Sequence, residues 1–109
     1  MKRGEIWTAS GNVEYAAKPR PVVIVQDSHF DNLDSVTVCG FTSDPTDTPL
    51  FRILVEPTAF NGLQSLSRIM VDKILTIRKS NLGYRIGHLS VRDLKRLDRA
   101  IATFLGLSD

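Results

Sequence analysis

The chain has 109 residues, of which 42% are hydrophobic and 24% charged, and its formal net charge at pH 7 is +2. These values predict one compact, soluble domain, residues 1–109, with a modest core. No apolar run approaches the length of a membrane span, and the opening "MKRGEIW" lacks the apolar stretch of a signal peptide, so we expect a cytoplasmic protein that makes no membrane contact.

The charge distribution and the cysteine content indicate which partners and which covalent links to expect. Residues 1–55 carry five Lys or Arg and seven Asp or Glu, whereas residues 56–109 carry nine and five. The basic second half favours a polyanionic partner, although a solvated surface produces the same pattern. The single cysteine, Cys39, excludes an internal disulfide, and its apolar setting "VTVCGF" predicts a buried, unreactive thiol.

Most of the chain reads as short β-strands. They are rich in Val, Ile and Phe and are separated by clusters of Gly, Pro, Asn and Asp. The expected strands cover residues 4–10, 21–26, 35–42, 51–57 and 67–77. The segments "DSHFDNLDS" and "TSDPTDTP" are predicted loops, and "FNGLQ" is a predicted turn.

The end of the chain has helical periodicity instead. Within "SVRDLKRLDRAIATFLGL", Leu94, Leu97 and Ile101 recur on one face, which Phe104 or Leu105 continues. Ser90 with Asp93 is typical of an N-cap, and Gly106 is a plausible stop. The sequence therefore predicts a small, strongly bent antiparallel sheet or barrel closed by one amphipathic helix.

An arginine enclosed by prolines stands before the second expected strand, in "AAKPRPVVIVQD". Pro19 and Pro21 restrict the backbone on both sides of Arg20, so its guanidinium is held by an unusually stiff segment. A surface cation in an ion pair is the simpler interpretation of Arg20.

The third expected strand ends in a hydroxyl pair, Thr42-Ser43, where a strand opens into a loop. Such a position suits a hydroxyl that faces a ligand, and it also suits a turn-capping role.

Two other groups of residues are weaker candidates for a metal or catalytic site. Asp27, Asp31 and Asp34 have the spacing of one helix face and could hold a divalent ion, but they lack the pattern of a calcium loop. Turn formation and helix capping explain them better, and we expect neither a metal nor a cofactor. Cys39 lies in the middle of an expected strand, which favours a core role for it over a nucleophilic pair with a histidine.

Taken together, the segments "RGEIW", "KPRPVVIVQD", "VTVCGFTSDPTDTPLFRILVEP" and "SRIMVDKILTI" with the final helix resemble the MazF/PemK-like toxins, the endoribonucleases of type II toxin–antitoxin modules. The resemblance runs in order over nearly the full chain. It implies a compact SH3-like antiparallel β-barrel of the CcdB/MazF type with a C-terminal α-helix. It also implies a homodimer whose interface groove holds single-stranded RNA, and a cognate antitoxin whose acidic or amphipathic tail occupies that groove.

The resemblance also implies roles for individual residues. The family's catalytic arginine falls on Arg20 and its catalytic threonine on Thr42. The loop from about Ser10 to Pro19, in which Glu14 matches a frequent acidic residue, would cover the RNA. Asp72-Lys73 replaces the family's usual acidic-glutamine pair, and Lys18 is inserted near the arginine; both departures bear on base preference.

Five further positions are expected to contact RNA by stacking, phosphate binding or hydrogen bonding. Trp7 and Tyr15 are aromatic candidates, with a core or interface role as the alternative for Trp7. Lys18 and Lys73 could meet phosphates or serve solubility, and Ser43 could supplement Thr42.

The implied reaction is a metal-independent, sequence-specific cut made by the RNA's own 2′-hydroxyl, leaving a 2′,3′-cyclic phosphate and a 5′-hydroxyl. A rigid guanidinium offers two parallel donors to phosphate oxygens, which suits the charge that develops there. Arginine stays protonated near neutral pH, so the base remains open between Glu14, a water and a transiently neutral Arg20. Two alternatives remain: a gyrase-binding toxin of the CcdB type without nuclease activity, and a barrel that binds a peptide or nucleic acid without catalysis.

Overall fold

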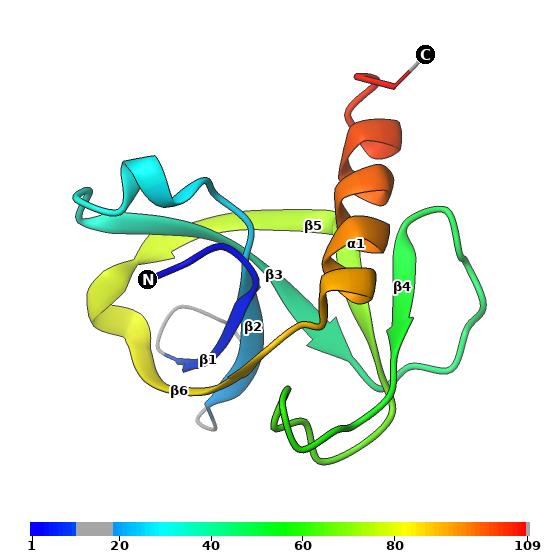
Figure 1. Ribbon diagram of the computed structural model, residues 1–109, viewed down its shortest axis with the longest axis horizontal. Helices are drawn as coiled ribbons and strands as arrows, with labels where there is room; N and C mark the ends of the chain where they lie inside the picture. The colour runs from blue at the N-terminus through cyan, green and yellow to red at the C-terminus, as the bar shows by residue number, and fades with distance from the viewer. Residues whose placement is uncertain (11–18, 109) are drawn as a thin grey trace.

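The computed structural model describes residues 1–10 and 19–108. They form one curled sheet with a helix against it, as Figure 1 shows. The strands are β1 (Glu5–Ala9), β2 (Arg20–Ile24), β3 (Ser35–Thr42), β4 (Arg52–Val55), β5 (Ser67–Arg78) and β6 (Leu82–His88). Two short 3-10 turns, η1 (Ser28–Phe30) and η2 (Lys79–Asn81), precede the C-terminal helix α1 (Val91–Phe104).

Within the described residues the strands pair in the order β4-β5-β3-β2-β1-β6, with every neighbouring pair antiparallel. The long strand β5 bends midway: its residues from Ile69 to Ile74 lie opposite the three-residue stretch from Phe41 to Cys39, so β5 carries the extra residues of a bulge. This bend curls the sheet into the expected barrel-like shape, with β4 and β6 as its two edges. The mainly β, SH3-like fold is therefore confirmed.

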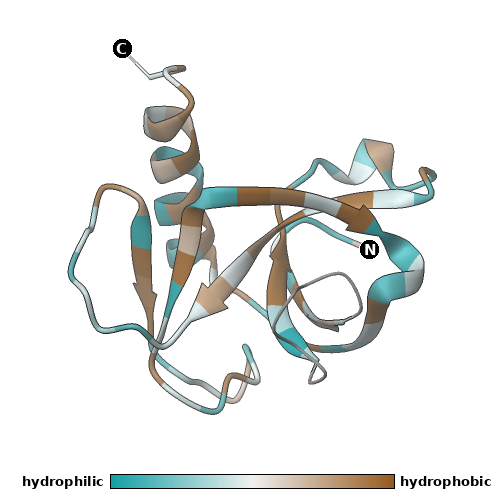
Figure 2. Ribbon diagram, turned by 180° about the vertical axis from the view of Figure 1, so that it is seen from behind, coloured by the Kyte–Doolittle hydropathy of each residue, from teal (hydrophilic) through white to brown (hydrophobic). Residues whose placement is uncertain are grey.

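The curled sheet buries apolar side chains on both faces. On the helix side, Ile6, Val23 and Val71 are fully buried together with Leu97 of α1. On the opposite side, Val22, Ile24, Val36, Val38 and Ile77 form a second buried cluster. Because both faces are covered, a strand such as β2 carries consecutive apolar residues, Val22, Val23 and Ile24, and Figure 2 shows apolar (brown) stretches along the strands.

Helix α1 starts and ends as its sequence predicts. The Ser90 hydroxyl accepts a hydrogen bond from the Asp93 amide at 3.1 Å, so Ser90 is the N-cap. Leu97 and Ala100 are buried, while Leu94 and Ile101 pack at the margin of the core. Gly106 has φ +73°, the left-handed conformation that ends many helices. In the described part of the chain, no helix is both long and apolar enough to cross a membrane.

The five strands expected from the sequence are present, and the segment 35–42 matches β3 residue for residue. Strand β6 was not predicted. Its sequence "LGYRIGH" contains two glycines and lacks a run of β-branched residues, and it is a strand because β1 pairs with it. Pro21 is the second residue of β2 rather than its first, because the strand begins at Arg20, and Pro21 lies beyond the last residue pair between β2 and β3.

Candidate RNA-cleavage site

Arg20 and Thr42 stand at adjacent strand ends on the sheet face that points away from α1. Strands β2 and β3 pair through Ile24–Val38 and Val22–Gly40, and continuing this register one step along the same face brings Arg20 level with Thr42. Phe41 and Val23 belong to the helix-side core. Since successive residues of a strand face opposite sides, Arg20 and Thr42 belong to the other face. The topology thus brings together the two residues that the sequence singled out.

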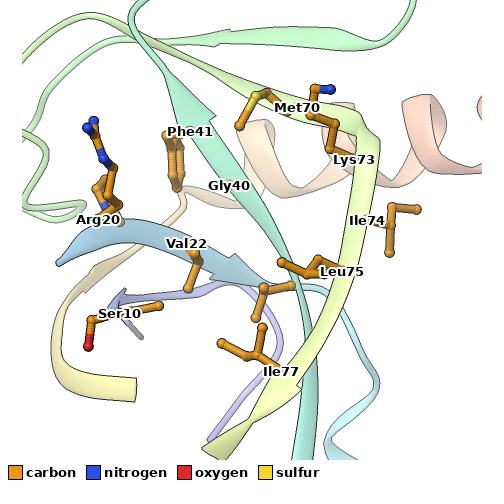
Figure 3. Close-up of a pocket in the computed structure, with 13 residues that line it drawn as sticks. Ser10, Arg20, Val22, Gly40, Phe41, Met70, Lys73, Ile74, Leu75 and Ile77 are labelled. Atoms are coloured by element: carbon orange, nitrogen blue, oxygen red, sulfur yellow. The ribbon is translucent and has the colours of Figure 1, made fainter. Parts of the chain in front are cut away.

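A pocket of about 230 Å³ lies on this face, between β2, β3 and β5. Figure 3 shows Arg20 on β2 and Lys73 on β5 at opposite sides of the pocket, with Gly40, Phe41 and Met70 between them. Its floor is apolar, and the remaining lining residues are Ala9, Ser10, Pro21, Val22, Val38, Ile74, Leu75 and Ile77. A cavity with an apolar floor and cations at its margins suits a nucleobase with its phosphates.

Among the described residues, the Thr42 side chain makes one hydrogen bond, which fixes it, and keeps its proton to donate. Its Oγ1 accepts the amide N–H of Asp44 at 3.1 Å, which is the turn-capping contact that its position predicted. Because that contact uses a lone pair, the hydroxyl proton remains available for a donor role. The capping interpretation is confirmed, and it is compatible with a ligand-facing hydroxyl.

Arg20 is the first residue of β2 and is exposed. Its backbone is held in the sheet by pairing with Ala9, and its neighbour Pro21 lies opposite Thr8. The following residues Val23 and Ile24 are almost fully buried, so the strand that carries the guanidinium is anchored in the core. This anchoring adds to the stiffness that the flanking prolines impose.

Asp72 is clamped by Arg52 rather than free. The Nε and Nη2 of Arg52 donate to the two carboxylate oxygens of Asp72 at 2.7 and 3.1 Å, and the side chains are only 16% and 21% exposed. These hydrogen bonds lower the pKa of Asp72 and raise the pKa of Arg52. Asp72 therefore presents a fixed, ionised carboxylate beside Lys73, which lines the pocket itself.

Trp7 is half-buried on β1, directly opposite Val22, and it packs against the second apolar cluster. Its Nε1 donates to Glu5 Oε1 at 3.0 Å. This hydrogen bond contributes to a lowered pKa of Glu5, against the opposing effect of burial. Trp7 does not line the pocket. The packing corresponds to the core role that was the alternative for this residue.

The remaining predicted residues divide into two groups. Ser43 is exposed directly after Thr42, where β3 has ended. Glu14, Tyr15 and Lys18 lie outside the described residues, so the predictions for them are untested.

Two arginines on this face were missed by the sequence reasoning. Arg52 pairs with Met70 in the β4–β5 ladder, and Arg68 pairs with Thr42 in the β3–β5 ladder. The available signal was a basic residue alternating with buried apolar ones in "FRILV" and "SRIMV", which places both arginines on the face opposite the helix.

The simpler interpretations hold for Cys39 and the aspartates. Cys39 is fully buried, and burial raises the pKa of its thiol to about 12, so it is no nucleophile. Asp27 caps η1 by accepting the His29 amide at 2.8 Å, and Asp31 binds the terminal ammonium of Met1 at 2.8 Å.

The chain was compared with known proteins. A family model described as PemK-like, MazF-like toxin of type II toxin–antitoxin system matches residues 2–105. The chain is 48% identical over 108 residues to a probable endoribonuclease MazF from Mycolicibacterium smegmatis, with 99% of each chain covered. It is 28% identical over 116 residues to endoribonuclease MazF9 from Mycobacterium tuberculosis, with 98% of each covered.

Solved structures have the same fold. The Mycobacterium tuberculosis toxin MazF-mt6 superposes with a TM-score of 0.80 at 28% identity, covering 96% of this chain and 99% of that one. An endoribonuclease in complex with its cognate antitoxin, from a mycobacterial species, gives a TM-score of 0.82 at 21% identity, covering 100% and 98%. The second likeness is one of fold alone.

Proposed function

Since the chain belongs to the PemK-like, MazF-like toxins of type II toxin–antitoxin systems and is an endoribonuclease, we propose that it cuts single-stranded RNA at specific sequences through the RNA's own 2′-hydroxyl. The 2′-oxygen attacks the adjacent phosphorus, the bond from phosphorus to the 5′-oxygen breaks, and the leaving oxygen takes up a proton. The products are a 2′,3′-cyclic phosphate and a 5′-hydroxyl. No metal is required, because the nucleophile belongs to the substrate and cationic side chains meet the charge.

The observation that carries this proposal is the placement of Arg20 and Thr42 at adjacent strand ends beside an apolar pocket. In the transition state, negative charge grows on the non-bridging phosphate oxygens. The guanidinium of Arg20 supplies two parallel donors to them, and the hydroxyl of Thr42 supplies a third. Arg20, as a protonated group beside the phosphate, also donates the proton to the leaving 5′-oxygen. The group that accepts the 2′-proton stays open between Glu14, a water and Arg20.

We further propose base recognition by Lys73 and Asp72, with Ser43, Trp7, Glu14, Tyr15 and Lys18 as additional RNA contacts. Lys73 has the strongest support among these, because it lines the pocket. Asp72 offers the remaining lone pairs of a carboxylate that Arg52 holds in place, which suit an amino group on a base edge.

The experiment is cleavage of a long, unstructured RNA in excess EDTA. Discrete fragments with cyclic-phosphate ends are expected from the wild type, and nearly complete loss of cutting from Arg20→Ala. Thr42→Ala is expected to retain a measurable remainder, because removing one hydrogen-bond donor from such a site costs about 100- to 1,000-fold. Arg99→Gln, on the exposed side of α1, is the matched control and is expected to cut normally. Equal cutting by Arg20→Ala and the wild type would refute the role of Arg20.

Regulation by a partner protein completes the proposal. We propose a cytoplasmic homodimer, each subunit one domain over residues 1–109, with RNA in the interface groove, and an antitoxin whose acidic or amphipathic tail covers Arg20. Leu75 supports an apolar contact there, since it lines the pocket and is 45% exposed. A saturated toxin–antitoxin complex should leave RNA intact; full cutting by that complex would reject this part. The CcdB-like alternative predicts intact RNA with free toxin and inhibition of gyrase.

A further inference from the structure

Arg68 lies on the side of Thr42 that is away from Arg20. It is the direct cross-strand partner of Thr42 in the β3–β5 ladder. Its neighbour two residues along, Met70, lines the pocket, and the intervening Ile69 belongs to the helix-side core. Arg68 therefore shares the pocket face with Thr42 and Arg20, and the three side chains form a row across β2, β3 and β5.

Spacing makes this row suitable for a polyanion. Neighbouring strands lie about 4.8 Å apart, so the backbone position of Thr42 lies between those of the arginines on the two flanking strands. A single strand of RNA that crosses the strand ends meets one cation on each side of the hydroxyl. With Arg20 and Thr42 on the phosphate that is cut, Arg68 is within reach of the neighbouring phosphate.

The contacts of Arg68 leave most of its donors available. Its Nη1 donates to the carbonyl oxygen of Asp44 at 3.3 Å, which is a long hydrogen bond near the loop surface. Among the described residues, Arg3, Arg52 and Arg96 each pair with a carboxylate, and Arg68 has no such ion pair. The amide and hydroxyl of Thr46 donate to Oδ1 of Asp44 at 2.9 and 2.8 Å, and these hydrogen bonds, with smaller contributions from the charges of Arg52 and Arg68, lower the pKa of Asp44.

The hydrogen bond to the Asp44 carbonyl also links the Arg68 side chain to the Thr42 hydroxyl through Asp44. Asp44 accepts from Arg68 through its carbonyl oxygen and donates through its amide to Thr42 Oγ1. A phosphate bound at Arg68 would thus be held beside the loop that orients Thr42.

We propose that Arg68 is a substrate-binding residue of this toxin, which holds the RNA phosphate next to the one that is cut. The inference rests on the proposed function, because it takes RNA as the ligand. A guanidinium fits this role since its five N–H donors are fixed in a fork that matches phosphate oxygens.

The test uses an RNA that spans a mapped cleavage site and carries one 2′-deoxy nucleotide there, so that binding is measured without cutting. Its affinity for the wild type, Arg68→Gln and the control Arg99→Gln is measured by fluorescence anisotropy from low to high salt. Losing one phosphate contact to single-stranded RNA should reduce the slope of log affinity against log salt by about 0.7. We expect that reduction for Arg68→Gln only, with at least a fivefold higher Kd at low salt and a kcat within threefold of wild type.

Arg68→Lys separates charge from geometry. It should keep the wild-type salt slope while binding less tightly, since lysine offers a point charge without the fork. If the melting temperature of Arg68→Gln lies more than a few degrees below that of the wild type, RNA binding is tested with Arg68→Lys instead.

Two results would overturn the inference. One is Arg68→Gln with the Kd and salt slope of Arg99→Gln; the other is a lowered kcat with unchanged binding, which would make Arg68 a support for the loop alone. In either case, continued cutting by the wild type and loss in Arg20→Ala would leave the proposed function intact. Failure of the wild type to cut RNA would instead remove the proposed function itself.

Discussion

Thr42 illustrates how one side chain can serve the fold and, in the proposed mechanism, the reaction as well. Its oxygen accepts the Asp44 amide, which fixes the turn after β3, and its proton is left to donate. A hydroxyl whose rotamer is already set by the fold loses little freedom when a phosphate oxygen arrives, which is the basis of preorganised catalysis. At this scale the proposed catalytic hydroxyl and the predicted turn cap belong to the same side chain.

Arg52 and Asp72 form the strongest side-chain ion pair of the candidate site, and acid should weaken it. Asp72 has a folded-state pKa below its ordinary value of about 3.9. The pair therefore stabilises the fold above that value, and the stabilisation is lost as the pH falls through the lower, folded pKa. We expect Asp72→Asn to reduce the free energy of unfolding at pH 7 by about 1–2 kcal/mol.

The pH dependence of this difference in the free energy of unfolding tests its cause. Urea unfolding of the wild type and Asp72→Asn is followed from pH 7 downwards, and the difference should narrow below about pH 4. Glu56→Gln, which changes an exposed carboxylate directly after the end of β4, should match the wild type throughout. A difference for Asp72→Asn that stays constant to pH 3 would show that the ionised pair is not its cause.

Strand β6 shows how an element can form without a strong signal of its own. Gly87 leaves no room for a side chain, because a Cβ there would lie 2.2 Å from the Phe60 carbonyl oxygen; a Cβ on Gly83 would lie 2.3 Å from the side-chain oxygen of Thr8, which would have to move. The strand is held by β1 and by the hydrogen bond from the His88 amide to the Phe60 carbonyl, at 3.0 Å.

This close approach gives a prediction for the element. Gly87→Ala would push backbone against backbone, so we expect it to destabilise the protein by about 2–3 kcal/mol in thermal or urea unfolding. Gly106→Ala is the matched control, because nothing lies within 4 Å of its added Cβ and only its φ of +73° is strained; it should cost about 1 kcal/mol. A Gly87→Ala protein as stable as Gly106→Ala would contradict the packing described for β6.

The elements that were predicted from the sequence carry a periodic pattern of apolar residues within their own segment, and the features that were missed do not. Strand β3 and helix α1 carry their own periodicity, in "SVTVCGFT" and in Leu94, Leu97 and Ile101. Strand β6 depends on a partner far away in sequence, and so does the position of Arg68 opposite Thr42. Such cross-strand relations are set by tertiary pairing and the bulge in β5, neither of which is encoded in a local pattern.

At the scale of the whole molecule, the sheet separates stability from chemistry. One face packs against α1 through fully buried residues such as Val71 and Leu97. The other face carries the pocket, which Arg20 and Lys73 line, and the cross-strand pair of Thr42 and Arg68. The basic residues of the second half of the chain are thus divided between the pocket face, through β5, and the solvated side of α1.

The central claim is that the RNA cuts itself while the protein stabilises its charged phosphate. The most direct measurement replaces the single nucleotide on the 5′ side of a mapped cut with its 2′-deoxy form and follows cleavage of both RNAs by the wild-type protein. Because the 2′-oxygen is the proposed nucleophile, the substituted RNA should stay whole at that bond while still binding with comparable affinity. Cleavage of the deoxy-substituted bond at the rate of the unmodified RNA would contradict the account.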